Sequence, residues 1–288
     1  MKSCMLRWRK LACILLAVAF IFIVSGCDSG EYSAEKRFWL ASLKYNRLMQ
    51  NYKTAKPADF QEAVNAFREI TIRYPFWFNS PKAQFYIGQL SAAQNDISKA
   101  RDEFSVILKD YSSDKNMCAS ALFAIARLYE MEGDWNKAKE ALEKITKDYS
   151  GTGTAFNIPL YIAEHHKKEN HVEEANSAYS YALENYKKFV LNNSDKYGSL
   201  AALDFVLTCY ADQEKWQEAA DYLENLIRDY SNSPLAAKSL LMQGVLYQDK
   251  LSQPQKAKEN YQKVIDKYPD TLFAKSAKQL TDLINKQK

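Results

Sequence analysis

A stripe of four side chains recurs six times along the 288-residue sequence at a nearly constant interval. Each copy begins with alanine, continues with residues at i+4 and i+7, and ends with tyrosine at i+11, which is the spacing of one α-helix face. Successive alanines lie 37, 38, 37, 44 and 38 residues apart, and a period of this length indicates an array of repeated units. The six stripes are Ala63, Phe67, Ile70 and Tyr74; Ala100, Phe104, Ile107 and Tyr111; Ala138, Leu142, Ile145 and Tyr149; Ala175, Tyr179, Ala182 and Tyr186; Ala219, Leu223, Leu226 and Tyr230; and Ala257, Tyr261, Val264 and Tyr268.

A second helical pattern precedes most of these stripes. Apolar residues at i, i+3, i+4 and i+7 stand before the third and fifth stripes, and a less complete set stands before the sixth. Short polar turns such as Glu132-Gly133-Asp134 separate the two patterns. We therefore expect each unit to be a helical hairpin. The residues of this second pattern are Leu122, Ile125, Ala126 and Tyr129; Leu203, Val206, Leu207 and Tyr210; and Leu240, Gly244 and Tyr247.

The combined pattern resembles the tetratricopeptide repeat (TPR) family over most of residues 35–270. The small residue of that family's first helix matches Gly88, Ala126, Ala163 and Gly244. Units of 37 to 38 residues exceed the family's usual length of about 34, and the 44-residue interval fits a second helix lengthened over Asn185–Asn192. The resemblance implies an all-α fold, a TPR-type superhelix (α-solenoid) of about six hairpins. A further amphipathic helix over Leu272–Ile284 is expected to cap the array within residues 271–288.

The amino terminus has the parts of a secretory signal. Residues 2–10 are basic, Leu11–Val24 is an uninterrupted apolar run of 14 residues, and small residues follow. Fourteen residues are too few to span a bilayer comfortably, since a spanning helix needs about 20. The tetrapeptide Val24-Ser25-Gly26-Cys27 resembles the lipobox of bacterial lipoproteins, which implies a cleaved signal over residues 1–26 and lipid on Cys27. An ordinary signal or short anchor with an incidental cysteine is the alternative.

These features together predict where in the cell the protein is located. Residues 27–34 would form a lipidated amino terminus and short tether, placing the protein in the bacterial cell envelope, facing the periplasm. Within the TPR group, Arg73-Tyr74-Pro75-Phe76 followed by Ser80-Pro81 is similar to the first repeat boundary of the BamD-like lipoproteins of outer-membrane barrel assembly. Six units are more than that group usually shows. Asp28 follows the cysteine, and in enteric lipoproteins aspartate there favours the inner membrane, so the choice of membrane stays open.

The sequence gives little sign of catalysis or of bound cofactors. With only 8 glycines it has no glycine-rich phosphate loop and no nucleophile elbow, so we expect no enzyme and no cofactor. The only histidines, His165, His166 and His171, lie across a helix end and a turn, where we expect solvated surface rather than a metal site. Cys118 and Cys209 are predicted to be small buried residues, although an oxidising compartment would permit a disulfide.

The net charge of +4 comes entirely from the predicted signal, because the first 26 residues carry four basic residues and no acid. The remaining chain has 35 basic and 35 acidic residues, so its charge offers no argument for nucleic-acid binding. Residues 250–288 hold nine lysines against four acids. This stretch is either a solvated helix face or a contact for anionic lipid headgroups or an acidic partner.

Two surfaces are candidates for binding. The cluster Phe76-Trp77-Phe78 lies in a predicted link between hairpins, where it either packs over a neighbouring hairpin or forms a docking patch. The TPR resemblance also implies a concave face lined by first helices, suited to an extended peptide or a partner helix. By that alignment its lining would include Phe85, Gln89, Phe123, Arg127, Leu160, Glu164 and Leu241.

We accordingly expect a membrane-tethered scaffold or adaptor for other cell-envelope proteins, with outer-membrane barrel assembly as its setting. The alternative is a TPR regulator of peptidoglycan synthesis or of another envelope complex. Neither nucleic acid nor a small-molecule substrate is expected as a partner.

Overall fold

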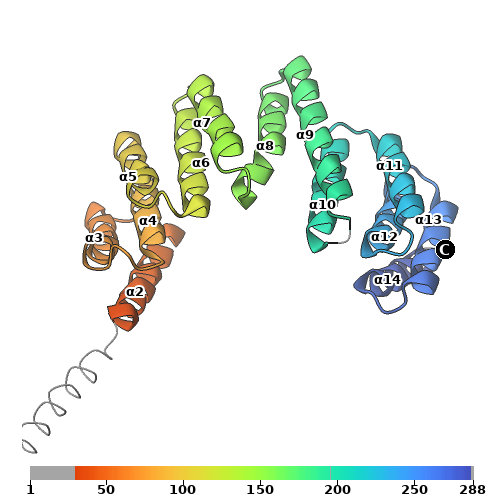
Figure 1. Ribbon diagram of the computed structural model, residues 1–288, viewed down its shortest axis with the longest axis horizontal. Helices are drawn as coiled ribbons and strands as arrows, with labels where there is room; N and C mark the ends of the chain where they lie inside the picture. Colours follow the sequence, from red (N-terminus) through yellow and green to blue (C-terminus); the bar gives the residue numbers. More distant parts are fainter. Residues whose placement is uncertain (1–29, 195, 287–288) are drawn as a thin grey trace, which may run out of the picture. The chain divides into compact units, whose positions relative to one another are not determined.

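The computed structural model describes residues 30–194 and 196–286, and within them every regular element is an α-helix (Figure 1). The predicted signal over residues 1–26, Cys27 and Asp28 lie outside the described residues. The helices fall into two compact units, the first ending at Ile158 and the second beginning at Pro159. Among the residues described, no helix is both long and apolar enough to cross a bilayer.

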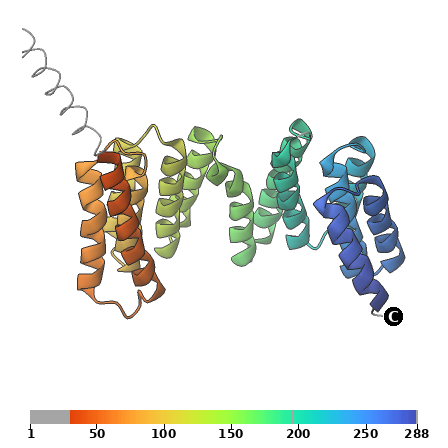
Figure 2. The same cartoon turned by 90° about the horizontal axis from the view of Figure 1, so that it is seen from below.

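The first unit is built from helices that pack consecutively, each against the next along the chain. Figure 2 shows α2 and α3 side by side and antiparallel, as expected for a hairpin. We find that α2 begins five residues before the array's predicted start at residue 35, and Ala34 is already fully buried. The helices are α2 (Gly30–Gln50), α3 (Pro57–Arg73), α4 (Ser80–Ala93), α5 (Ile97–Asp110), α6 (Lys115–Met131) and α7 (Trp135–Asp148).

The second unit continues the same plan and ends on a single helix. The boundary between the units falls inside α8 (Gly153–Lys168), at Pro159, whose ring nitrogen has no hydrogen to donate within the helix. The last helix packs on the one before it, so six hairpins and a final capping helix are confirmed in the part of the chain that the structure describes. The other helices are α9 (Val172–Asn192), α10 (Tyr197–Asp212), α11 (Trp216–Asp229), α12 (Pro234–Asp249), α13 (Pro254–Lys267) and α14 (Leu272–Lys286).

The repeated stripe forms the core of each hairpin. All six alanines and the residues at i+4 and i+7 are buried. Five of the six tyrosines are the C-cap residues of their helices, and each donates its backbone N–H to the carbonyl of the residue four positions earlier. The sixth, Tyr186, lies within α9, which continues to Asn192 as the 44-residue interval predicts. The five capping tyrosines are Tyr74, Tyr111, Tyr149, Tyr230 and Tyr268.

Glycine in two first helices permits close approach of the second helix. A Cβ on Gly88 would lie 2.6 Å from Cε1 of Phe104, and one on Gly244 would lie 2.5 Å from Cε1 of Tyr261. Real Cβ atoms essentially never come so near a neighbour. The aromatic ring at i+4 of the stripe therefore occupies the space that any larger residue would need, as the sequence predicts for Gly88.

Most of the turns inside the hairpins share one backbone conformation. In five of them a residue with positive φ follows the first helix, and in four the next residue donates its N–H to the carbonyl five positions earlier, at 2.9–3.0 Å. This is the Schellman closure of a helix end. Glycine occupies the position only at Gly133, with φ of 77°. The other positions are Asn95, Asn170, Glu214 and Ser252.

Candidate partner-binding surfaces

The first unit contains four of the side chains predicted to line a groove, and they lie in different environments. Phe85 is partly buried, with its ring 5.0 Å from that of Phe104. Gln89 accepts a hydrogen bond from the Tyr45 hydroxyl at 2.8 Å, and Phe123 is partly buried. Arg127 is exposed and pairs with Glu130 at 3.4 Å.

The second unit contains the other three, two of which prove to be core residues. Leu160 is buried and its backbone N–H donates to the Tyr186 hydroxyl at 3.2 Å. Leu241 is buried in the cluster formed by α12, α13 and α14. These two leucines pack between helices rather than facing an open groove, because the apolar i, i+3, i+4 spacing of a first helix also serves its contact with the second. Only Glu164 of the three is exposed, and a single surface formed by all seven residues stays a prediction.

Glu164 belongs to a small polar cluster that joins three helices of the second unit. Partial burial, and then the negative charge of Asp212, raise the pKa of the Glu164 carboxyl. Lys167 pairs with Asp212 at 3.5 Å, and the Tyr179 hydroxyl donates to the same carboxylate at 3.1 Å. Burial and that carboxylate raise the pKa of Tyr179. The cluster ties α8, α9 and α10 together.

No metal-binding site is present among the residues described. No group of three or more histidine, cysteine, aspartate or glutamate side chains is placed there to hold an ion. The ring centres of His165 and His166 lie 5.7 Å apart, and those of His166 and His171 lie 6.0 Å apart. Cys118 and Cys209 are buried free cysteines in different units, as the sequence predicts.

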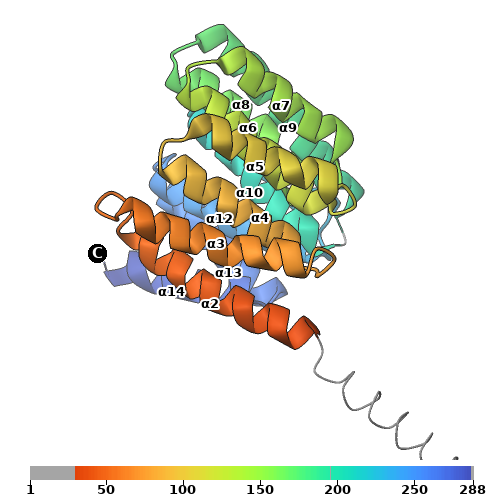
Figure 3. The ribbon, with the colours of Figure 1, turned by 90° about the vertical axis from the view of Figure 1, so that its left-hand side faces the viewer.

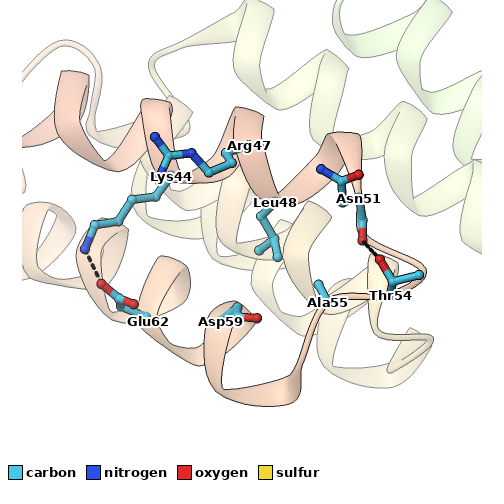
Figure 4. Close-up of a pocket in the computed structure, with 8 residues that line it drawn as sticks. All are labelled: Lys44, Arg47, Leu48, Asn51, Thr54, Ala55, Asp59 and Glu62. Atoms are coloured by element: carbon cyan, nitrogen blue, oxygen red, sulfur yellow. Dashed lines mark hydrogen bonds and ion pairs between the residues drawn. The ribbon is translucent and has the colours of Figure 1, made fainter.

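A hollow of about 470 Å³ lies where α2 ends and α3 begins (Figure 4). Cations and carboxylates share its lining, and Lys44 and Glu62 pair with each other across it. Thr54 Oγ1 donates to the Asn51 carbonyl at 3.1 Å. The lining carries two cations and two carboxylates, so the hollow has no net charge with which to attract an ionic ligand. Its lining is Lys44, Arg47, Leu48, Asn51, Thr54, Ala55, Asp59 and Glu62.

The basic carboxy-terminal stretch makes several contacts within its own unit. The Lys250 ammonium lies 4.8 Å from the ring centre of Trp216, and that of Lys256 lies 5.1 Å from Tyr247. Lys258 donates to Asn285 at 2.7 Å. Four other lysines of this stretch are exposed: Lys263, Lys267, Lys275 and Lys278.

The aromatic link between α3 and α4 divides into a buried and an exposed part. Trp77 is only 9% exposed and packs edge-on against Phe38, with ring centres 5.4 Å apart. Phe76 is fully exposed and Phe78 is 68% exposed. The prediction of core packing is therefore confirmed for Trp77, and the docking alternative stays open for the two phenylalanines.

The structure shows an exposed apolar stripe on α2 that the sequence analysis did not identify. Tyr32, Trp39 and Leu43 stand at i, i+7 and i+11, so they share one helix face, and Trp39 is 60% exposed. Ala34 and Ala41, on the opposite face, are buried. The spacing is visible in the sequence, but it looks like a core stripe, and only the packing of the first hairpin shows that it faces outward. We call Tyr32, Lys36, Trp39, Leu40, Leu43 and Arg47 the outer α2 face.

Comparison with known proteins agrees with the hairpin geometry. Two family profiles, both described as tetratricopeptide repeat, match the chain, one over residues 120–152, 208–233 and 238–271 and the other over 58–115. No curated protein matches the sequence.

Solved structures that match this chain include BtubC (BKLC) from P. vanneervenii, at 18% identity and a TM-score of 0.44, covering 79% of this chain and 90% of that one. A tetratricopeptide repeat protein from Parabacteroides merdae has 14% identity and a TM-score of 0.31, with coverages of 83% and 99%. YrrB, described as a TPR protein with an unusual peptide-binding site, has 20% identity and a TM-score of 0.34, with coverages of 75% and 99%.

Proposed function

Because the chain is built from tetratricopeptide repeats, we propose that it is a membrane-anchored adaptor that binds other proteins of the bacterial cell envelope. Repeats of this kind are protein-interaction scaffolds. The lipobox-like sequence ending at Cys27 supports attachment to a membrane, since lipid on that cysteine would hold the repeats at the bilayer surface. Tethering raises the local concentration of the adaptor for partners in the same membrane.

The observation that carries the adaptor role is the outer α2 face. Terminal units of repeat arrays normally present a polar surface to solvent. Here the first helix instead exposes Trp39, Leu40 and Leu43 to solvent, between the basic side chains of Lys36 and Arg47. Large exposed apolar side chains gathered on one face mark interaction sites. The chemistry of this face suits a partner segment that is apolar and flanked by acidic residues.

We infer outer-membrane barrel assembly as the setting, on the resemblance of the Arg73-Tyr74-Pro75-Phe76 boundary. Regulation of peptidoglycan synthesis is the alternative. Affinity capture from detergent-solubilised envelope separates them, because barrel-assembly components among the captured proteins support the first and peptidoglycan synthases support the second. Capture of neither class would contradict both settings.

Two variants test whether capture depends on the outer α2 face. Trp39→Ser with Leu43→Ser removes two of the four apolar side chains of the outer α2 face and changes no buried side chain. Tyr197→Ser, at an 88% exposed tyrosine on α10, is the matched control. We expect the double variant to capture about tenfold less partner, since truncating central aromatic contacts typically has this effect, and the control to capture as much as the wild type. Equal capture by all three proteins would contradict binding through α2.

Lipid attachment has its own test. Cells expressing the wild-type protein are fed radioactive fatty acid, and label is expected on the wild-type chain and absent from Cys27→Ser. Label that survives the substitution would refute attachment at Cys27.

A further inference from the structure

The α3–α4 link lies at the end of the first unit where α2 begins (Figure 3), and Phe76 and Phe78 of this link are exposed. A Cβ built on Gly30, the first residue of α2, would lie 3.7 Å from Cε1 of Tyr74, the first residue of the link. Tyr32, one turn into α2, is also largely exposed. The chain thus enters the first unit beside Phe76 and Phe78.

The link holds these two side chains outward in a defined conformation. Trp77, between them in sequence, is buried against Phe38. Its backbone N–H donates to the Tyr74 carbonyl at 3.0 Å, and the Ser80 hydroxyl donates to the same carbonyl at 2.5 Å. Phe76 is fully exposed, whereas the Phe78 ring packs edge-on against Trp77, with ring centres 5.1 Å apart, and still leaves most of its surface exposed.

The length of chain before α2 limits how far a lipid anchor can lie from this link. Cys27 is three residues before Gly30, and three fully extended residues span at most about 11 Å. The first unit's aromatic link is therefore held close to the membrane surface whenever Cys27 carries lipid. An attached bilayer would thus lie within reach of Phe76 and Phe78.

Charge around the link is compatible with an anionic lipid surface. Residues 74–79 contain no acidic side chain. Arg73 precedes them with its side chain 59% exposed, and its Nε lies 3.0 Å from Glu69, while Lys82 is exposed on the first turns of α4. Exposed aromatic side chains next to basic ones are typical of segments that rest in the interfacial layer of a membrane.

We propose that Phe76 and Phe78 insert into the interfacial layer of the bilayer to which Cys27 is attached. They then act as a second, non-covalent contact that fixes the orientation of the first unit on the membrane. This inference rests on the proposed lipid anchoring. It leaves the outer α2 face to protein partners, and a protein ligand for the link is the competing outcome of the test below.

The test places a reporter beside the two phenylalanines. Pro75→Cys adds an exposed thiol to the processed, lipid-bearing protein, in which Cys4 and Cys13 would have left with the signal, Cys27 would carry lipid, and Cys118 and Cys209 are buried. The protein, carrying an environment-sensitive dye on this thiol, is reconstituted into vesicles of phosphatidylethanolamine and phosphatidylglycerol that contain a nitroxide-labelled lipid. We expect the nitroxide to quench the dye, and quenching to fall at least about threefold when Phe76→Ser and Phe78→Ser are added. Met131→Ser, at another exposed apolar residue of the first unit, is the control and should leave quenching unchanged.

The outcomes separate the two proposals. A dye that is not quenched although the protein floats with the vesicles would overturn insertion of the link and leave the anchoring intact. Equal quenching with and without the two serines would overturn the role of the phenylalanines. A chain that neither floats nor carries lipid on its amino-terminal peptide by mass spectrometry would overturn the anchoring and this inference together.

Discussion

The contact between Gly88 and Phe104 makes a quantitative prediction about how each hairpin closes. In most exposed helices, replacing glycine with alanine increases stability, by about 1 kcal/mol, because alanine has the higher helix propensity. At Gly88 the added Cβ would lie 2.6 Å from the Phe104 ring, about 0.8 Å short of the 3.4 Å at which ordinary contact begins. Gly88→Ala is therefore expected to decrease the free energy of unfolding.

The size of the effect follows from how little the ring can move. Phe104 is buried at 2% exposure, and its ring also packs against Phe85, one turn before Gly88 on α4, with ring centres 5.0 Å apart. Overpacking of a rigid core typically costs about 1–3 kcal/mol, and a clash this short belongs near the upper end. After the gain in helix propensity, a net loss of about 2 kcal/mol remains.

Urea denaturation followed by far-ultraviolet circular dichroism measures the effect, with Gly198→Ala as the matched control. At Gly198 a Cβ would lie 3.5 Å from Phe189, an ordinary contact, so the control should be neutral or slightly stabilising. In a Phe104→Leu background the smaller side chain makes room, and the loss caused by Gly88→Ala should largely disappear. A stabilising Gly88→Ala, or a loss unchanged in that background, would refute the close-packing argument.

Three further predictions concern turns, caps and thiols. Glu214→Gly should stabilise the protein by roughly 0.5–1 kcal/mol in urea denaturation, because Glu214 holds a φ of 56° that glycine adopts without strain; a loss of stability would contradict this. Asp134 is the N-cap residue of α7, and hydrogen bonds from Lys137 lower the pKa of its carboxyl. Asp134→Ala should therefore lower the free energy of unfolding above the ordinary aspartate pKa of 3.8, and the difference from the wild type should disappear as pH falls below that value. A difference that does not change with pH would argue against stabilisation by this N-cap. Burial raises the pKa of Cys209 to about 12, so Cys209 and Cys118 should react with thiol reagents only after denaturation, and rapid labelling of the native protein would disprove their burial.

The hairpin repeat was predictable because its signal is local and periodic. Ala63 and its five equivalents, with their i+4 and i+7 partners, occupy one helix face, and burial of that face follows directly from the spacing. The extension of α9 was equally accessible, since a gain of about two turns preserves the packing face.

Which side chain of the aromatic link is buried depends on a contact with a residue distant in the sequence. Three consecutive aromatic residues give no sign of which one turns inward, and Trp77 is selected by its packing on Phe38, 39 residues earlier. Some of the turn residues with positive φ were equally hard to predict from the sequence. Gly133, Asn95 and Asn170 are residue types that favour positive φ, whereas at Glu214 and Ser252 the geometry of the hairpin imposes it.

Candidate binding residues were the least predictable. Leu160 and Leu241 occupy positions that a family alignment assigns to a groove, yet their own units bury them. The outer α2 face is the opposite case, since its spacing looks like a core stripe and, in the part of the chain that the structure describes, no helix covers Trp39. In both cases exposure depends on which neighbouring helix is present, and single-sequence periodicity carries no information on that.

The most direct test of the adaptor role is site-specific photocrosslinking in living bacteria. A photoreactive amino acid replaces Trp39 on the outer α2 face or, as control, the even more exposed Tyr197. The adaptor account predicts a discrete crosslinked product with an envelope protein from position 39, lost in the presence of Leu43→Ser, and none from position 197. No product from position 39, or the same products from both positions, would contradict it.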